Sequence, residues 1–479
     1  MIAKQEWNYI FNPQSVAIVG ISAEGSVWSS PGQRYLAALL EYGFKGKIYP
    51  INPRGGEILG LKVYANIRDI PELVDYVISC VPALATPQLI KDCAAKGVKV
   101  VHFFTSGFSE TGTEEGKQLE SEICSLAYQG GIRVIGPNCM GVYCPKTNFT
   151  YRPTFAEESG SVAFICQSGG NATYLVREGA KRGVRFSKVV SYGNACDIDE
   201  SDLIEYLADD RDTEIILAYI EGVKDGRRFS RVLKEAARAK PVIVLKSGVG
   251  EAGARAVASH TGALVGAEEI WDGLLYQVGA VRVCSLDELI DMAVSFSYLS
   301  LPLGRRVSIL GMGGGAAVLA TDDCTNAGLV VPRFSEEIHG RLSSLLRTEA
   351  GAILSNPIDL AAEAWEAGFY NILNVLADCD DIDLNMVHFP LGLIGFLPPP
   401  EINKMWDFLM GEVVKAHREL AKPIVAVIHI PTSSEDYEWM LKAQRKFYQA
   451  GIPVYHSISS AAKAVDRFLS YHERKLAGG

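Results

Sequence analysis

Apolar and polar residues follow two patterns that alternate along nearly the whole chain. Short runs rich in Val and Ile, typical of strands, are followed by longer segments with helical spacing of apolar residues. This alternation predicts sheets of mainly parallel strands. A first series of predicted strands comprises Val16–Gly20, Lys47–Ile51, Tyr76–Val81, Val98–Phe104 and Arg133–Ile135. A second series comprises Ser161–Cys166, Lys188–Tyr192, Glu214–Ile220 and Pro241–Leu245, and a third comprises Val307–Leu310, Leu384–Phe389, Pro423–Ile428 and Pro453–Tyr455.

Two breaks that contain proline separate the three series of strands. We interpret Tyr143–Ser159 and Tyr298–Arg306 as connecting segments, because proline and glycine interrupt regular structure there. The chain is therefore expected to form three α/β domains, over residues 1–143, 159–297 and 306–470. A length of 479 residues agrees with this number, since a domain usually takes about 150 residues.

Composition and charge narrow the classes of function. Hydrophobic residues make up 48% of the chain and charged residues 21%, which is the balance of a globular protein. A formal net charge of −10 disfavours general binding to nucleic acids or anionic membranes. No apolar run reaches the roughly 18 residues of a membrane span, and the N-terminus lacks the apolar core of a secretory signal. The 10 cysteines include no CxxC pair, which favours reduced thiols and a cytoplasmic location.

The first predicted strand runs directly into a turn that begins at Gly20. A glycine there lets a phosphate approach backbone amides, although Ser22 replaces the second glycine of a dinucleotide-binding fingerprint. The alternative is a turn that only packs a strand against a helix. The second strand ends in Pro53-Arg54, where an NAD-binding domain usually carries an acid. This difference disfavours NAD and offers Arg54 to a sugar phosphate, unless Arg54 is a solvated surface residue.

Three later strand ends of the first series carry small or polar residues, at Val81-Pro82, Ser106-Gly107 and Asn138-Cys139. Loops at the carboxyl ends of parallel strands line the ligand crevice of an open sheet. Each segment alone is compatible with an ordinary turn. Together they predict a pocket for an adenine nucleotide in the first domain.

The most distinctive segment of the chain is Lys246–Gly266, which contains five glycines and few bulky side chains. Glycine permits many backbone conformations, so this segment is predicted to be a loop that can bend or move. It carries His260, whose neutral imidazole is a competent nucleophile near pH 7. We expect His260 to accept a phosphoryl group at one site and release it at another; the alternative is an exposed loop histidine without a catalytic role.

Two strand ends of the second series suit a phosphohistidine. One strand leads into Ser168-Gly169-Gly170 and a predicted helix, whose first backbone amides and the Ser168 hydroxyl would bind a phosphate. Another strand ends at Glu221, and a carboxylate that accepts a hydrogen bond from one ring nitrogen leaves the other free to attack phosphorus. Glu221 is alternatively a surface acid at the end of a strand.

These segments, in this order, resemble the α subunit of NDP-forming acyl-CoA synthetases, which are relatives of succinyl-CoA synthetase. The resemblance covers nearly the whole chain, and it is most specific over Gly253–Gly262, which is similar to the family's phosphohistidine loop. Met140 stands at a position where the family usually has leucine. The other segments similar to family motifs are Gln167–Gly170, Ile220–Gly226, Gly136–Gly141 and Asn356–Asp359.

The resemblance implies a Rossmann-like CoA-binding domain followed by two flavodoxin-like domains. It also implies a reversible reaction in which acyl-CoA, phosphate and ADP give a carboxylic acid, CoA and ATP. An acyl phosphate and a phosphohistidine at His260 are the implied intermediates. CoA is then expected along the turns of the first domain, at Gly20, Ser22, Pro53, Arg54, Val81, Pro82, Ser106, Gly107, Asn138 and Cys139.

ADP or ATP with Mg²⁺ is expected on a separate ATP-grasp β subunit, in an α₂β₂ assembly, because three domains fill this chain. No metal site is expected on the chain itself. Two other functions compete with this one: a non-catalytic CoA-binding regulatory or scaffold protein, and an NAD(P)-dependent oxidoreductase. The presence of His260, Glu221 and Ser168 disfavours the scaffold, and the missing acid after the second strand disfavours the oxidoreductase.

Overall fold

The computed structural model describes most of the chain. The described residues are 2, 4–22, 30–250, 253, 267–311, 314–346, 352–360, 367–390, 399–431 and 433–477. They form two compact units, of which the first is Met1–Ala180 with Arg185–Leu289 and the second is Lys181–Val184 with Ile290–Gly479. Within this part of the chain, no helix combines the length and the apolar composition that crossing a membrane requires.

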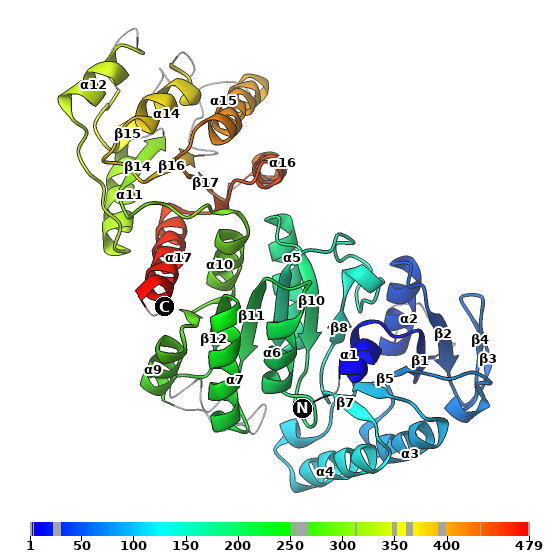
Figure 1. Ribbon diagram of the computed structural model, residues 1–479. Helices are drawn as coiled ribbons and strands as arrows, with labels where there is room; N and C mark the ends of the chain where they lie inside the picture. Colours follow the sequence, from blue (N-terminus) through cyan, green and yellow to red (C-terminus); the bar gives the residue numbers. More distant parts are fainter. Residues whose placement is uncertain are drawn as a thin grey trace. The chain divides into compact units, whose positions relative to one another are not determined.

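The first unit begins with a parallel sheet in the order β2-β1-β5-β6-β7 (Figure 1). Its strands are β1 (Ser15–Val19), β2 (Lys47–Ile51), β5 (Tyr76–Ser79), β6 (Val100–Phe103) and β7 (Arg133–Ile135). A hairpin of β3 (Gly56–Ile58) and β4 (Leu61–Val63) follows β2. The helices are α1 (Lys4–Phe11), α2 (Pro31–Glu41), α3 (Thr86–Lys96) and α4 (Glu114–Gln129). Helices α3 and α4 lie side by side, and their apolar faces enclose a core with β5 and β6.

The second sheet of this unit has the order β13-β12-β11-β9-β10-β8. Its strands are β8 (Gly141–Tyr143), β9 (Val162–Cys166), β10 (Phe186–Ser191), β11 (Ile215–Ile220), β12 (Val242–Lys246) and β13 (Val281–Val283). The helices are α5 (Gly169–Lys181), α6 (Glu200–Asp209), α7 (Gly226–Ala239) and α9 (Glu268–Val278). Only β8 runs antiparallel, against β10, among the described strands of this sheet. The sequence pattern did not predict β8, which lies within two residues of the proline-containing connection.

The second unit contains a parallel sheet in the order β15-β14-β16-β17-β18. Its strands are β14 (Val307–Gly311), β15 (Ile358–Asp359), β16 (Leu384–Phe389), β17 (Ile424–Ile428) and β18 (Val454–Tyr455). The helices are α11 (Gly314–Asn326), α12 (Glu336–Ser343), α14 (Phe369–Ala377), α15 (Pro399–Glu419), α16 (Ser434–Gln449) and α17 (Ile458–Ala477), and α10 (Leu286–Tyr298) begins just before the boundary of the unit. Single 3₁₀ turns elsewhere in the chain are η1 (Ile67–Asp69), η2 (Ala83–Ala85), η3 (Ser109–Thr111) and η4 (Pro145–Thr147).

The three large sheets share one strand topology. Counted along the chain, the parallel strands of each sheet have the order 2-1-3-4-5. In such a sheet the connections leave the first and third strands in opposite directions, which opens a crevice at their carboxyl ends. The first two crevices therefore lie at the ends of β1 and β5, and of β9 and β11. The predicted α/β class with parallel sheets is confirmed; the residue limits of the three domains stay a prediction.

A short segment joins the two sheets of the first unit. Residues 136–140 connect β7 to β8, and the loop after β10 packs on them. The backbone N–H of Asn194 donates to the Pro137 carbonyl at 3.0 Å, and that of Cys196 donates to the Gly136 carbonyl at 3.0 Å. Gly193 has a φ of +53°, and a Cβ added there would lie 2.1 Å from the Pro137 oxygen. This contact requires glycine at position 193.

Replacing Gly193 with alanine is expected to lower the free energy of unfolding by roughly 1–3 kcal/mol from the left-handed backbone alone. The overlap with the Pro137 carbonyl adds to this cost. Urea unfolding followed by circular dichroism measures the change. Gly226→Ala is the control, because an added Cβ at that first residue of α7 meets nothing within 4 Å. Equal stability of the two variants would contradict the packing that we describe.

Candidate active site

The predicted nucleotide turns of the first sheet are joined to one another by hydrogen bonds. The Thr105 hydroxyl donates to the Val81 carbonyl at 2.9 Å, and the Asn138 N–H donates to the Thr105 carbonyl at 2.9 Å. Asn138 adopts a left-handed backbone with φ of +58°, a conformation that asparagine tolerates well. The turns after β5, β6 and β7 are therefore held together at one edge of the sheet.

The turn after β1 reaches the same edge. Gly20 has a φ of +94°, and a Cβ there would lie 2.7 Å from the carbonyl oxygen of Cys80. Close packing of two strand ends thus requires this glycine whether or not a phosphate binds. The Asn52 side chain donates to the Ile21 carbonyl and accepts from the Arg54 N–H at 2.9 Å, so it connects the turns after β1 and β2.

The predicted CoA residues differ in their exposure. Pro53, Arg54, Pro82 and Ser106 are exposed, whereas Ser22, Val81, Gly107 and Asn138 are half-buried. Cys139 is buried, its Sγ donates to the Phe103 carbonyl at 3.6 Å, and burial raises the pKa of its thiol. Cys139 therefore packs inside the edge, whereas its neighbour Asn138 is only half-buried.

The side chain of Gln167 connects the predicted phosphate-binding turn of residues 168–170 (the phosphate turn) to Glu221 at the end of β11. Oε1 of Gln167 accepts from the backbone N–H groups of Glu221 and Gly222, the latter at 3.0 Å. The Gln167 N–H donates to the Tyr219 carbonyl at 3.3 Å. These bonds join the ends of β9 and β11, so Glu221 and Ser168, which follows Gln167, lie at the same edge of the sheet. The sequence analysis included Gln167 only as part of a motif and did not identify this role.

Helix α5 begins at this turn with two glycines. The Ser168 hydroxyl accepts from the Asn171 N–H at 3.3 Å, and the Ser168 carbonyl accepts from the Ala172 N–H at 3.0 Å. Gly170 is exposed, and Gly169 beside it is half-buried against the Met140 side chain. Free amides at a helix start attract anions, because the helix dipole is positive there.

Glu221 is only 7% exposed, and its Oε1 accepts from the Tyr219 hydroxyl at 3.3 Å. Beside it, Nζ of the buried Lys246 donates to the Glu221 carbonyl at 2.9 Å and to the Ser247 carbonyl. Burial lowers the pKa of Lys246 to about 8, and the Glu221 charge opposes this effect. The sequence does show Lys246 as a lysine at the end of an apolar strand, but the sequence analysis did not use this signal.

His260 lies outside the described residues. The strand that leads toward its loop, β12, pairs with β11 at the Glu221 edge, with Lys246 opposite Ile220. Across the described parts of the chain, no group of three or more His, Cys, Asp or Glu side chains gathers in a way that would hold a metal ion.

Met140 connects the two halves of the site. Its N–H donates to the Ser191 hydroxyl at 3.1 Å, and its carbonyl accepts from the Tyr35 hydroxyl at 2.9 Å. A Cβ added at Gly169 would lie 2.4 Å from Cγ of Met140, so this side chain touches the start of α5. Asn138 therefore lies only two residues before Met140, which contacts the phosphate turn.

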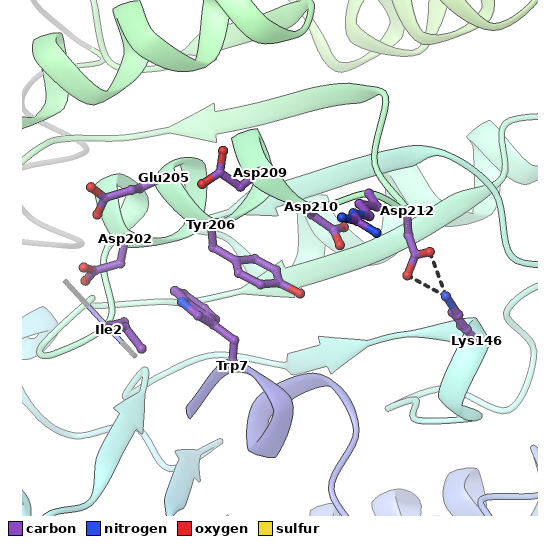
Figure 2. A pocket seen from close by; sticks show the side chains of 10 residues that line it. Ile2, Trp7, Lys146, Asp202, Glu205, Tyr206, Asp209, Asp210 and Asp212 are labelled. Carbon is purple, nitrogen blue, oxygen red and sulfur yellow. Dashed lines mark hydrogen bonds and ion pairs between the residues drawn. The ribbon is translucent and has the colours of Figure 1, made fainter. Parts of the chain in front are cut away.

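A separate hollow of about 620 Å³ lies beside α1 and α6 (Figure 2). Trp7 of α1 and Tyr206 of α6 stack there with their ring centroids 4.5 Å apart. The other lining residues are Ile2, Lys146, Asp202, Glu205, Asp209, Asp210, Arg211 and Asp212. The five carboxylates disfavour binding of an anion such as CoA or phosphate, and none of the predicted site residues lines this hollow.

Comparisons with known proteins identify the domains and the family of the chain. The model of a CoA binding domain matches residues 14–145, and that of a succinyl-CoA ligase-like flavodoxin domain matches residues 159–296. The chain is 36% identical to the α subunit of ADP-forming acetate–CoA ligase II of Pyrococcus furiosus, over 98% of this chain and 99% of that protein. It is 37% identical to ADP-forming acetate–CoA ligase II of Archaeoglobus fulgidus, over 98% of this chain but only 67% of that protein.

A solved structure extends the likeness to three dimensions. The dinucleotide-forming acetyl-coenzyme A synthetase 1 of Ca. Korarchaeum cryptofilum, in complex with phosphate and ADP, superposes with a TM-score of 0.81 at 30% identity. That match covers 98% of this chain and 97% of the other chain. With a match to a CoA binding domain, a match to a succinyl-CoA ligase-like flavodoxin domain and a relative matched from end to end, this chain belongs to the family of ADP-forming acetate–CoA ligase α subunits.

Proposed function

We propose that this chain is the α subunit of an ADP-forming acyl-CoA synthetase. It converts acyl-CoA, phosphate and ADP to a carboxylic acid, CoA and ATP, and it runs in both directions. The observation that carries the proposal is the contact of Met140 with Gly169, which supports a position of the CoA turns beside the phosphate turn. An acyl group on CoA at one pocket then lies within reach of a phosphate at the other.

The first step joins the two pockets. A phosphate oxygen attacks the thioester carbonyl, the carbon–sulfur bond breaks, and CoA leaves as the thiolate. The amides at Gly169 and Gly170 and the Ser168 hydroxyl hold the phosphate, because the start of a helix favours negative charge. CoA lies along Gly20, Ser22, the turn Pro53-Arg54, and the later turns at Val81-Pro82, Ser106-Gly107 and Asn138-Cys139.

The second step moves the phosphoryl group to the chain itself. A ring nitrogen of His260 attacks phosphorus, the bond from phosphorus to the acyl oxygen breaks, and the carboxylate leaves. The Glu221 carboxylate accepts the N–H of the other ring nitrogen and stabilises the positive charge that develops on the imidazole. The burial of Glu221 strengthens this interaction, because the surrounding dielectric is low.

The phosphohistidine then delivers its phosphoryl group to ADP. We infer that ADP and Mg²⁺ bind to a separate ATP-grasp β subunit, in an α₂β₂ assembly that acts in the cytoplasm on a small carboxylic acid. Two facts support a partner: a relative matched over its full length is named as a subunit, and a longer relative extends beyond the match with this chain.

His260 is expected to carry the phosphoryl group when the full chain is incubated with acetyl-CoA and ³²P-phosphate. The label should be lost in acid and retained in base, as an N–P bond is. His260→Ala should carry no label, and His339→Ala, which changes an exposed histidine of α12, should label like the wild type. Label that persists in His260→Ala, or a wild type that binds CoA without labelling, would reject the catalytic function and favour a CoA-binding scaffold.

Glu221→Gln is expected to slow the labelling of His260 by roughly 100-fold, because the amide keeps the shape of the side chain but loses the charge that stabilises the imidazolium. Rapid quenching measures the labelling rate, and calorimetry with CoA shows whether the first pocket is intact. CoA affinity should not change. A labelling rate equal to that of the wild type would remove Glu221 from the mechanism.

A further inference from the structure

The loop after β10 carries a buried asparagine whose amide donates to residues that lie beside the first sheet. Asn194 is only 7% exposed, and its Nδ2 donates to Oε2 of Glu110 at 2.6 Å and to Oε2 of Glu120 at 2.8 Å. The same Nδ2 donates to the Ser109 hydroxyl at 3.3 Å. Oδ1 of Asn194 is buried and has no hydrogen-bond partner among the described residues. The amide therefore acts as a donor, and its acceptors lie on η3 and α4.

The two carboxylates that share this amide have no cation between them. Oε2 of Glu110 and Oε2 of Glu120 both lie within hydrogen-bond distance of one nitrogen, and neither carboxylate forms an ion pair in the part of the chain that the structure describes. Two carboxylates this close repel each other, and partial burial strengthens the repulsion. The Asn194 amide offsets the repulsion with N–H groups and adds no charge. An aspartate, which has the same shape, would instead bring a third negative charge to this place.

Glu110 in turn fixes the turn after β6, along which the proposed function places CoA. Its Oε1 accepts from the Gly107 N–H at 2.6 Å and from the Phe108 N–H at 3.2 Å. A Cβ added at Gly107 would lie 3.2 Å from Cβ of Ala83, so this turn also packs against the turn after β5. If Glu110 moved away from Asn194, it would release the amides at Gly107 and Phe108 and loosen the contact between two CoA turns.

The backbone of the same loop reaches a third CoA turn. The Asn194 N–H donates to the Pro137 carbonyl at 3.0 Å, one residue before Asn138. Two residues before Asn194, the Tyr192 N–H donates to the Cys166 carbonyl at 3.0 Å, at the end of β9. One short loop is therefore bonded to β9 and holds the turns after β6 and β7 from the side of the second sheet.

We propose that Asn194 is a positioning residue for CoA, which sets the affinity for CoA without touching it. It does so by holding Glu110 and Glu120 together, so that the turn at Gly107 keeps its conformation. The proposal rests on the proposed function, because that function places CoA along this turn. Asn194 forms no hydrogen bond with Ser168 or Glu221 in the described structure. A change at Asn194 is therefore expected to raise the KM for acyl-CoA and to leave the labelling rate at saturating acyl-CoA unchanged.

The test is calorimetric titration of the full chain with CoA. Asn194→Asp should weaken CoA binding about 10- to 100-fold, the loss expected for a hydrogen bond to a charged group. Asn194→Ala should weaken it less, because alanine removes the donor without adding a charge. Asn326→Asp, which adds the same charge at the exposed end of α11, is the matched control and should bind CoA like the wild type. Thermal unfolding by circular dichroism shows whether each variant folds.

A second pair of variants separates this link from simple repulsion of an anionic ligand. Glu110→Gln removes a negative charge near CoA, yet it should also weaken CoA binding, because two amide N–H₂ groups then face each other. Asn194→Asp combined with Glu110→Gln exchanges donor and acceptor and restores the number of charges. The double variant should bind CoA within about threefold of the wild type, since residues in contact are coupled in their effects. Glu110 is only half-buried, so Glu110→Gln keeps the test valid if a variant at Asn194 does not fold.

Three results would overturn the proposal. They are a folded Asn194→Asp or Glu110→Gln protein that binds CoA like the wild type, a double variant that binds no better than the single ones, and a folded Asn194 variant that loses labelling rate at saturating acetyl-CoA while its KM is unchanged. A wild type that binds no CoA would overturn this proposal together with the proposed function. Calorimetry does not depend on turnover, so a wild type that binds CoA through this link but never labels His260 would reject the reaction alone.

Discussion

The geometry of the whole site depends on the segment of residues 136–140, which joins the edge strand of one sheet to a strand of the next. Five residues span at most about 18 Å even when fully extended, so the covalent chain keeps the ends of β7 and β8 close together. Reacting atoms must approach to about 3–3.5 Å for acyl transfer, and a long flexible linker would not hold two pockets to that distance. The packing of the loop after β10 on this segment removes the freedom that remains.

That loop also reaches the CoA turns. Nδ2 of Asn194 donates to Oε2 of Glu110 at 2.6 Å and to Oε2 of Glu120 at 2.8 Å. The other oxygen of Glu110 accepts from the Gly107 N–H at 2.6 Å. The turn at Gly107 is therefore held in place by a side chain that belongs to the second sheet, and the CoA turns and the phosphate turn behave as parts of one framework.

The molecule is acidic overall, but its charges are distributed unevenly between the site and the rest of the surface. The chain carries a formal net charge of −10, yet the second sheet ends in the N-terminus of α5, whose first residues are Gly169 and Gly170. The buried Lys246 lies next to Glu221, and burial lowers the pKa of its amine. The acidic side chains collect instead at surfaces such as the hollow beside α1 and α6 (Figure 2).

The sequence by itself determined the α/β class, most of the strands, and the residue types at strand ends such as Ser168 and Glu221. It did so because periodicity and turn composition are local properties of the chain. Only the tertiary structure decided that β8 joins the second sheet, that Gln167 links Glu221 to the phosphate turn, and that Asn194 bonds two carboxylates beside the CoA turns. These relations depend on segments distant in the sequence that meet through packing, and a single sequence contains no pattern that shows which distant side chains share a pocket.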